Sequence, residues 1–131
     1  LLQPHYNAIV RNEYEGALLA LAVKEEIAVL PYFALAAGFL TGKYQPGVAV
    51  ESVRAEDMPE YMNDRGWAIL QALADIAAQH NAPIAATALA WLRAQPGIAA
   101  PIASARTPEQ LSQLLPIVEL SPEQIAQVNA L

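Results

Sequence analysis

Residues 27–44 of this 131-residue chain, IAVLPYFALAAGFLTGKY, carry the clearest indication of its fold class. The stretch opens with Ile27–Tyr32, a short and bounded apolar run that is typical of a buried strand. Upstream, Asn12 is an N-cap residue followed at N3 by a carboxylate, which predicts the start of a helix. Before that helix, Leu1–Asn7 alternates apolar and polar residues as a strand does. Strand, helix and strand in this order predict two parallel strands joined by a helix.

The same alternation continues downstream. Residues 45–63 combine proline, glycine and mixed charge without a sustained period, and are predicted to form a long loop. Helical spacing of apolar residues begins at Asp64, and Pro83 suits the first turn of a further helix. A third apolar run, Ile98–Ala103, is interpreted as a third strand.

The last part of the chain carries two helix-start patterns. At Thr107 and Ser121 an N-cap residue precedes proline at N1 and glutamine at N3, and the second predicts a closing helix within residues 120–131. Three strands cannot close a barrel, but they fit the end of an eight-stranded one. We therefore predict an α/β fold, the C-terminal part of a TIM-type (β/α)8 barrel with strands 6 to 8 and their helices. Residues 1–131 would be a single half-barrel segment, and the abrupt start without methionine predicts a fragment.

The composition excludes several functional classes. The chain is 55% hydrophobic and 15% charged, which excludes a disordered tail. Seven Lys and Arg against thirteen Asp and Glu give a net charge of −6, which argues against nucleic acid as a partner. There is no cysteine, and His5 and His80 lack companions at a metal-binding spacing, so no metal is expected. No apolar run approaches the roughly 18 residues of a membrane helix, and a soluble, cytoplasmic protein without a membrane partner is predicted.

The first candidate binding loop is Tyr32–Lys43. In a βα barrel, sites lie at the C-terminal ends of the strands, and phosphates commonly bind after the last two. Small residues in this loop let a ligand approach the backbone, and Lys43 adds a positive charge. Because the loop lacks a complete phosphate-binding motif, a glycine-rich turn with a surface lysine is the more common explanation of such a pattern.

The second candidate loop follows the third strand. Ser104 and Arg106 lie beside a predicted helix start, whose free N–H groups favour an anion, and Arg106 offers a bidentate phosphate donor. From spacing alone, an ordinary surface arginine is an equally good interpretation. No Gly-x-Ser-x-Gly motif is present, which argues against a hydrolase nucleophile.

Taken in order, these motifs resemble those of the aldo-keto reductase family. The resemblance covers essentially the whole chain, and its motifs are Gln3-Pro4-His5-Tyr6-Asn7 for the sixth strand, Val29-Leu30-Pro31-Tyr32 and Gly38-Phe39-Leu40-Thr41-Gly42-Lys43-Tyr44 for the seventh strand and cofactor loop, Ala88-Leu89-Ala90-Trp91-Leu92 for the seventh helix, Ser104-Ala105-Arg106-Thr107-Pro108-Glu109-Gln110-Leu111 after the eighth strand, and Leu120-Ser121-Pro122-Glu123-Gln124 for the closing helix. It implies an oxidoreductase that reduces aldehydes or ketones with NADPH by hydride transfer. The implied partners are a small carbonyl substrate and the N-terminal half of the same barrel.

The resemblance also implies cofactor-binding roles. Gln3 would hydrogen-bond the nicotinamide carboxamide, and Tyr32 would stack on the nicotinamide ring. The pyrophosphate would be cradled, largely through the backbone, by Phe33, Ala34, Leu35, Ala36, Ala37, Gly38 and Lys43. The 2′-phosphate and the adenine of NADP(H) would lie against Ser104, Arg106, Gln110 and Gln113.

The chain departs from the family pattern at three positions. Phe33 and Ala34 stand where the family usually has Ser and Pro, which removes a hydroxyl contact and leaves the backbone contacts. Leu114 stands where many members carry an adenine-contacting Asn.

Catalytic residues are not expected within this chain. The family's catalytic Asp, Tyr, Lys and His lie on the first half of the barrel, so none is assigned here and the chain alone is expected to be inactive. The alternatives are a non-catalytic nucleotide-binding or regulatory module on the same scaffold, and a half-barrel whose nucleotide site has decayed.

Overall fold

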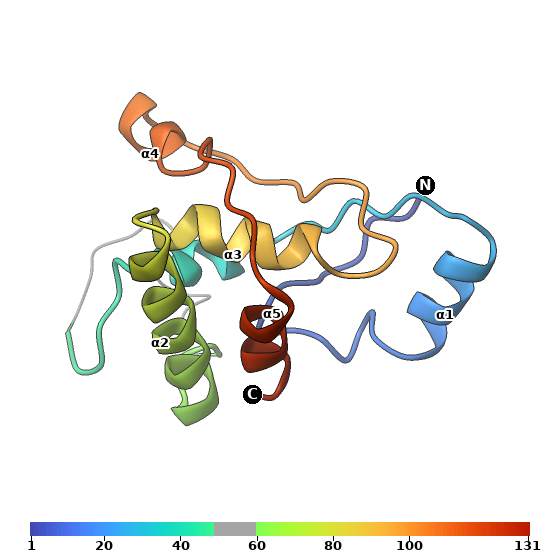
Figure 1. Cartoon of the computed structure of the whole chain (residues 1–131), viewed down its shortest axis with the longest axis horizontal. Helices are drawn as coiled ribbons and strands as arrows, with labels where there is room; N and C mark the ends of the chain where they lie inside the picture. The colour runs from blue at the N-terminus through green and yellow to red at the C-terminus, as the bar shows by residue number, and fades with distance from the viewer. Residues whose placement is uncertain (49–59) are drawn as a thin grey trace.

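The structure is a computed structural model that describes residues 1–48 and 60–131 (Figure 1). Within these residues the helical elements are α1 (Ala17–Lys24), the 3-10 helix η1 (Ala36–Thr41), α2 (Asp64–Gln79), α3 (Ile84–Arg93), α4 (Pro108–Ser112) and α5 (Pro122–Asn129). The long loop predicted over residues 45–63 falls mostly outside the described residues, because residues 49–59 are not described. No helix among the described residues is both long and apolar enough to cross a membrane.

The three predicted strands are extended segments that pair in parallel. The bridges join Leu2 to Val29, His5 to Tyr32 and Val29 to Ile98. The segment that contains Val29 therefore lies between the other two, as consecutive parallel units require. The prediction of three regular strands is wrong, however, since the described residues pair only through these isolated bridges.

Proline explains why the pairing does not continue as regular strands. Pro4, Pro31 and Pro101 lie one in each segment, and a proline has no N–H to donate to a neighbouring strand. Their carbonyls still accept: Tyr32 N donates to Pro4 O at 3.0 Å, and Ile102 N donates to Pro31 O at 2.8 Å. The parallel register is preserved while the ladder is interrupted.

The first helix begins later than its capping pattern predicts. Asn12 lies in a turn, and α1 starts only at Ala17, after Gly16 with a φ of 103°. That backbone conformation is left-handed and cannot continue a right-handed helix. Tyr14, within the turn, is fully buried, and its hydroxyl donates to Pro96 O at 3.1 Å. Burial of this side chain has overridden the local capping signal.

The other helix starts agree with the sequence. Asn63 caps α2 at the predicted Asp64, and Pro83 is the N-cap of α3, one position before its predicted place in the first turn. Thr107 caps α4, and Ser121 forms a complete capping box with Gln124 at the start of α5. The predicted closing helix within residues 120–131 is therefore present.

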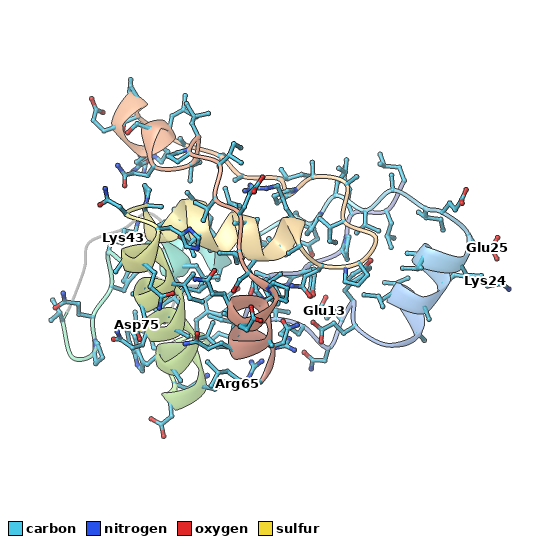
Figure 2. The ribbon with its side chains drawn as sticks, in the orientation of Figure 1. Glu13, Lys24, Glu25, Lys43, Arg65 and Asp75 are labelled. Carbon is cyan, nitrogen blue, oxygen red and sulfur yellow. The ribbon has the colours of Figure 1, made fainter. Side chains whose placement is uncertain are left out.

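The core lies between α2, α3, η1 and α5 and includes Tyr6 of the first extended segment. Trp91 of α3 is fully buried and donates from Nε1 to Asn129 Oδ1 at 2.9 Å. Two arginines hold the end of α5: Arg11 Nη2 donates to Asn129 O at 3.1 Å, and Arg65 Nε donates to Leu131 O at 2.9 Å. Figure 2 shows Arg65 near the end of α5. Cations at these carbonyls complement the C-terminal end of the helix dipole.

Candidate functional site

A cavity of about 670 Å³ lies between the loop that follows the middle extended segment and the loop that follows the last one. Its walls are formed by Tyr32, Phe33, Ala34, Leu35, Ala37, Gly38, Thr41, Lys43, Ala85, Ile102, Ala103, Ser104, Arg106, Gln110, Gln113 and Leu114. This set contains every residue for which a cofactor contact is predicted except Gln3 and Ala36. The two candidate loops, some seventy positions apart in the sequence, therefore form one site.

The structure does not bring Gln3 and Ala36 to the cavity wall. The Gln3 side chain is exposed on the first extended segment, and Ala36 is fully buried at the start of η1. Conversely, the sequence reasoning missed Ala85 and Ile102, which do line the cavity. Ala85 comes from the first turn of α3, and no local pattern links that turn to the loops.

The loop that follows the middle extended segment contains a tight turn with unusual backbone angles. Phe33, Ala36 and Ala37 have φ values of 52°, 49° and 56°, in the left-handed region that residues with a Cβ rarely adopt. Gly38 follows with a φ of 102°, and Thr41 Oγ1 donates to Gly38 O at 2.7 Å. Clusters of such conformations are typical of ligand-binding sites, where the surrounding structure offsets the strain.

Gly42 connects this turn to α3. It has a φ of 83°, and a Cβ placed on it would lie 2.6 Å from Ile84 Cδ1. Only a glycine allows this approach without moving Ile84, the first residue of α3. The close approach brings the loop against α3 and explains how Ala85 reaches the cavity.

Positive charge is concentrated in the cavity wall. Among the described residues that line it, Lys43 and Arg106 carry the only charges, although the chain as a whole has a net charge of −6. Lys43 Nζ lies 3.4 Å from the position of a Cβ on Gly38, and 5.2 Å from the centre of the Tyr44 ring. Figure 2 shows Lys43 near the turn between α2 and α3. Such a local reversal of charge favours an anionic ligand.

Arg106 lies immediately before Thr107, the N-cap of α4, and its backbone N–H is bound by Gln110. Gln110 Oε1 accepts from Arg106 N at 2.9 Å, while Gln110 N donates to Thr107 Oγ1 at 3.1 Å. The backbone N–H and the side-chain oxygen of Gln110 thus both stabilise the backbone beside Arg106. The helix itself, α4, has only five residues, so its dipole adds little and the side chain of Arg106 supplies the charge.

Two tyrosines of the core have structural roles. Tyr6 donates to Glu15 Oε1 at 2.9 Å, and burial, followed by this hydrogen bond, raises its pKa. Burial also raises the pKa of Tyr14, which donates to Pro96 O. A raised pKa makes the phenol a weaker acid, and neither residue lines the cavity.

The two histidines each contact a different polar side chain. His5 Nδ1 lies 3.6 Å from Glu13 Oε1, and His80 Nε2 lies 2.9 Å from Gln124 Oε1. Within residues 1–48 and 60–131, no three His, Cys, Asp or Glu side chains are grouped as metal ligands.

A comparison with protein families identifies the chain. The sequence model of the "Aldo/keto reductase family" matches residues 1–131. The chain belongs to the aldo/keto reductase family. An aldo-keto reductase of Babesia bovis is 35% identical over 120 residues, which cover 86% of this chain and 42% of that protein. A probable voltage-gated potassium channel subunit beta of Arabidopsis thaliana is 28% identical over 127 residues, covering 92% and 38% respectively.

A solved structure gives the same result for the fold. The glycerol dehydrogenase of Gluconobacter oxydans superposes with a TM-score of 0.79 at 26% identity, covering 98% of this chain and 40% of that one. The chain thus spans about 40% of the length of the relatives it matches. The neighbours are aldo-keto reductase TIM barrels, which supports the predicted fold class. The assignment of these residues to strands 6 to 8 stays a prediction.

Proposed function

We propose that the cavity binds NADP(H), and that the complete protein is an NADPH-dependent oxidoreductase that reduces aldehydes or ketones. The observation that carries this proposal is the union of the two candidate loops in one cavity with Lys43 and Arg106 as its charges. A cationic side chain in each loop and a mostly apolar surface between them favour a dinucleotide, which carries two phosphate regions. Family membership supplies the reaction class, which the geometry alone does not specify.

Each part of the cofactor is assigned to residues of one of the two loops. Tyr32 is 41% exposed and would present its ring to the nicotinamide. Lys43 and the backbone of the tight turn would hold the pyrophosphate. On the opposite wall, Ser104 and Arg106 would bind the 2′-phosphate, and Gln110 and Gln113 would lie along the adenosine.

Gln3 and Ala36 would contribute less to cofactor binding, because neither lines the cavity. Gln3 lies outside the cavity wall, so its contact with the carboxamide would require the side chain to turn inward. Ala36 would act only through the shape of the turn that it helps to form. When bound, NADPH supplies the hydride; this chain's residues bind and orient it.

The experiment that tests the proposal compares two cofactors and three variants. We expect the chain to bind NADPH more tightly than NADH, and Arg106→Ala to weaken NADPH binding by about tenfold while leaving NADH nearly unchanged, because one charge-assisted contact to phosphate is lost. Cofactor fluorescence titration measures both dissociation constants. Lys43→Ala should weaken both cofactors, since both carry the pyrophosphate. Lys24→Ala removes the same charge from α1, away from the cavity, and serves as the control.

Two results would contradict this assignment. Equal affinity for NADPH and NADH would contradict the assignment of a 2′-phosphate site, because the two cofactors differ only in that phosphate. If Arg106→Ala kept the full preference for NADPH over NADH, another group would have to bind that phosphate.

We expect the purified 131-residue chain to be inactive as a reductase. The family's proton-donating tyrosine and its companions are proposed to lie in the N-terminal half of the barrel, and Tyr6 and Tyr14 donate to structural partners instead. Oxidation of NADPH at 340 nm in the presence of a small aldehyde measures this. Turnover above the rate of the uncatalysed reaction would overturn the division of roles between the halves.

A second candidate is a nucleotide-binding or regulatory module without catalysis. The similarity to a protein named as a probable potassium channel beta subunit favours it. A tyrosine and a lysine at the expected strand ends of the N-terminal half would favour the enzyme, and their replacement would favour the module. In either case a cytoplasmic location stays a prediction.

A further inference from the structure

Asn7 makes a set of hydrogen bonds that no motif predicts. It is fully buried at the end of the first extended segment. Its Oδ1 accepts from Ile9 N and Val10 N, both at 2.9 Å, which closes a local turn. Its Nδ2 is directed across the fold and donates to Phe33 O at 3.0 Å. The same side chain therefore fixes its own turn and reaches the start of the cavity loop.

The accepting residue, Phe33, needs such support. Its φ of 52° is an outlier for a bulky residue, and such a strained conformation persists only where the surrounding structure supports it. The Asn7 amide binds the carbonyl of this residue and so restrains the peptide plane that follows it. Phe33 O also accepts from Ala36 N at 2.9 Å within its own turn, and the Asn7 amide adds a donor from the first extended segment. Loss of the amide would remove this second hydrogen bond, which joins the cavity loop to that segment.

The conformation of Phe33 places its ring in an aromatic cluster at the cavity. The ring centre lies 5.3 Å from that of Tyr32 and 5.3 Å from that of His5, and the His5 and Tyr32 rings are stacked at 5.4 Å. Tyr32 and Phe33 both line the cavity and are about two-fifths exposed. We name His5, Tyr32 and Phe33 the aromatic wall. Aromatic groups at these spacings stabilise one another and present flat faces to a ligand.

We propose that Asn7 is a positioning residue of the cofactor cavity. It holds Phe33 in its left-handed conformation and thereby sets the aromatic wall against which the nicotinamide end of the cofactor lies. This inference rests on the proposed function, because it assigns a ligand to the wall. It adds a connection between the first extended segment and the cavity loop, 26 positions later, that acts without contact between Asn7 and the ligand.

Two substitutions distinguish the acceptor role of Asn7 in its own turn from its donor role towards Phe33 O. Asn7→Asp and Asn7→Ser both keep an oxygen that can accept from the turn, and both lack the donor to Phe33 O. We expect each to weaken NADPH binding by about tenfold. In the protein without cofactor, amide hydrogens of residues 33–38 should exchange faster, and those of α2 should not. Asn129→Asp is the matched control, since its oxygen accepts from Trp91 and it does not line the cavity.

A double-mutant cycle distinguishes positioning from general destabilisation. Glycine adopts a positive φ without strain, so Phe33→Gly removes the need for the Asn7 donor, although it also removes a ring. We expect Asn7→Ser to change the NADPH dissociation constant by less than about threefold in the Phe33→Gly background, against about tenfold in the unsubstituted one. Equal effects in both backgrounds would overturn the inference.

The remaining outcomes are separable. Absence of NADPH binding by the unsubstituted chain would overturn the proposed function, and this inference with it. Tight binding by the unsubstituted chain together with unchanged binding and unchanged exchange in Asn7→Ser would overturn the role of Asn7 alone. Variants that bind as weakly as expected but whose exchange rises throughout α2 would show a loss of fold, and would overturn the positioning role as well.

Discussion

Trp91→Ala should lower the free energy of unfolding by about 3–5 kcal/mol, the largest loss expected for any single substitution in the core. Trp91 is the largest fully buried side chain, and its ring centre lies 5.7 Å from that of Tyr6. Its removal would leave a cavity between α3 and the first extended segment. The Arg11 guanidinium, 5.8 Å from the ring centre, would also lose its aromatic neighbour. Urea unfolding followed by circular dichroism measures the loss.

Trp91→Phe is the matched variant. It keeps an aromatic ring in the core but removes the N–H that donates to Asn129 Oδ1. We expect a loss of about 1–2 kcal/mol from the missing hydrogen bond and the smaller volume. If Trp91→Ala lowered the free energy of unfolding no more than Trp91→Phe does, the result would contradict the close packing of Trp91 in the core.

Gly66→Ala should destabilise the protein by about 3 kcal/mol, although alanine is the better helix former. Gly66 lies in the first turn of α2, and a Cβ there would overlap the backbone carbonyl of Tyr61. Backbone atoms cannot rotate away as a side chain can, so the turn before α2 must move. The N-cap would then be lost as well, because Gly66 N donates to Asn63 Oδ1 at 2.9 Å.

Ala68→Gly provides the control for this prediction. Ala68 is exposed on the same helix, and its replacement should lower stability by about 1 kcal/mol through helix propensity alone. Adding a methyl group at Gly66 and removing one at Ala68 are thus both expected to lower the stability of the protein. A Gly66→Ala protein as stable as the parent would show that the turn at Tyr61 does not approach α2 so closely. Urea midpoints and slopes measured side by side decide between these results.

Local patterns predicted the helix starts because a cap is a local interaction. Thr107 and Ser121 each accept from the N–H three residues later, which depends on adjacent residues only. The same reasoning failed at Asn12, where burial of Tyr14 competes with the cap and delays the helix to Ala17. A buried aromatic ring contributes more than the roughly 1 kcal/mol of a cap. Competition of this kind cannot be recognised without knowing what the ring packs against.

Local patterns predicted the components of the candidate site, and only the family resemblance predicted that both loops serve one cofactor. The small-residue loop with Lys43 and the segment with Arg106 were recognisable from their composition and from the family motifs. Their union required the parallel pairing of the middle segment with the last one. Gln3 was predicted to join them from its motif position, yet its side chain is exposed outside the cavity wall.

The order of elements, the family and the two loops that carry the binding residues could be predicted from the amino-acid sequence, because these depend on short-range spacing and on motif identity. Three features emerge only when the chain is folded: Ala85 lines the cavity, three prolines reduce the pairing to isolated bridges, and the Asn7 amide binds the Phe33 carbonyl. Each of these depends on contacts between residues far apart in the chain. Such contacts leave no local pattern, since the energy of burial and of a hydrogen bond is set by the partner that folding supplies.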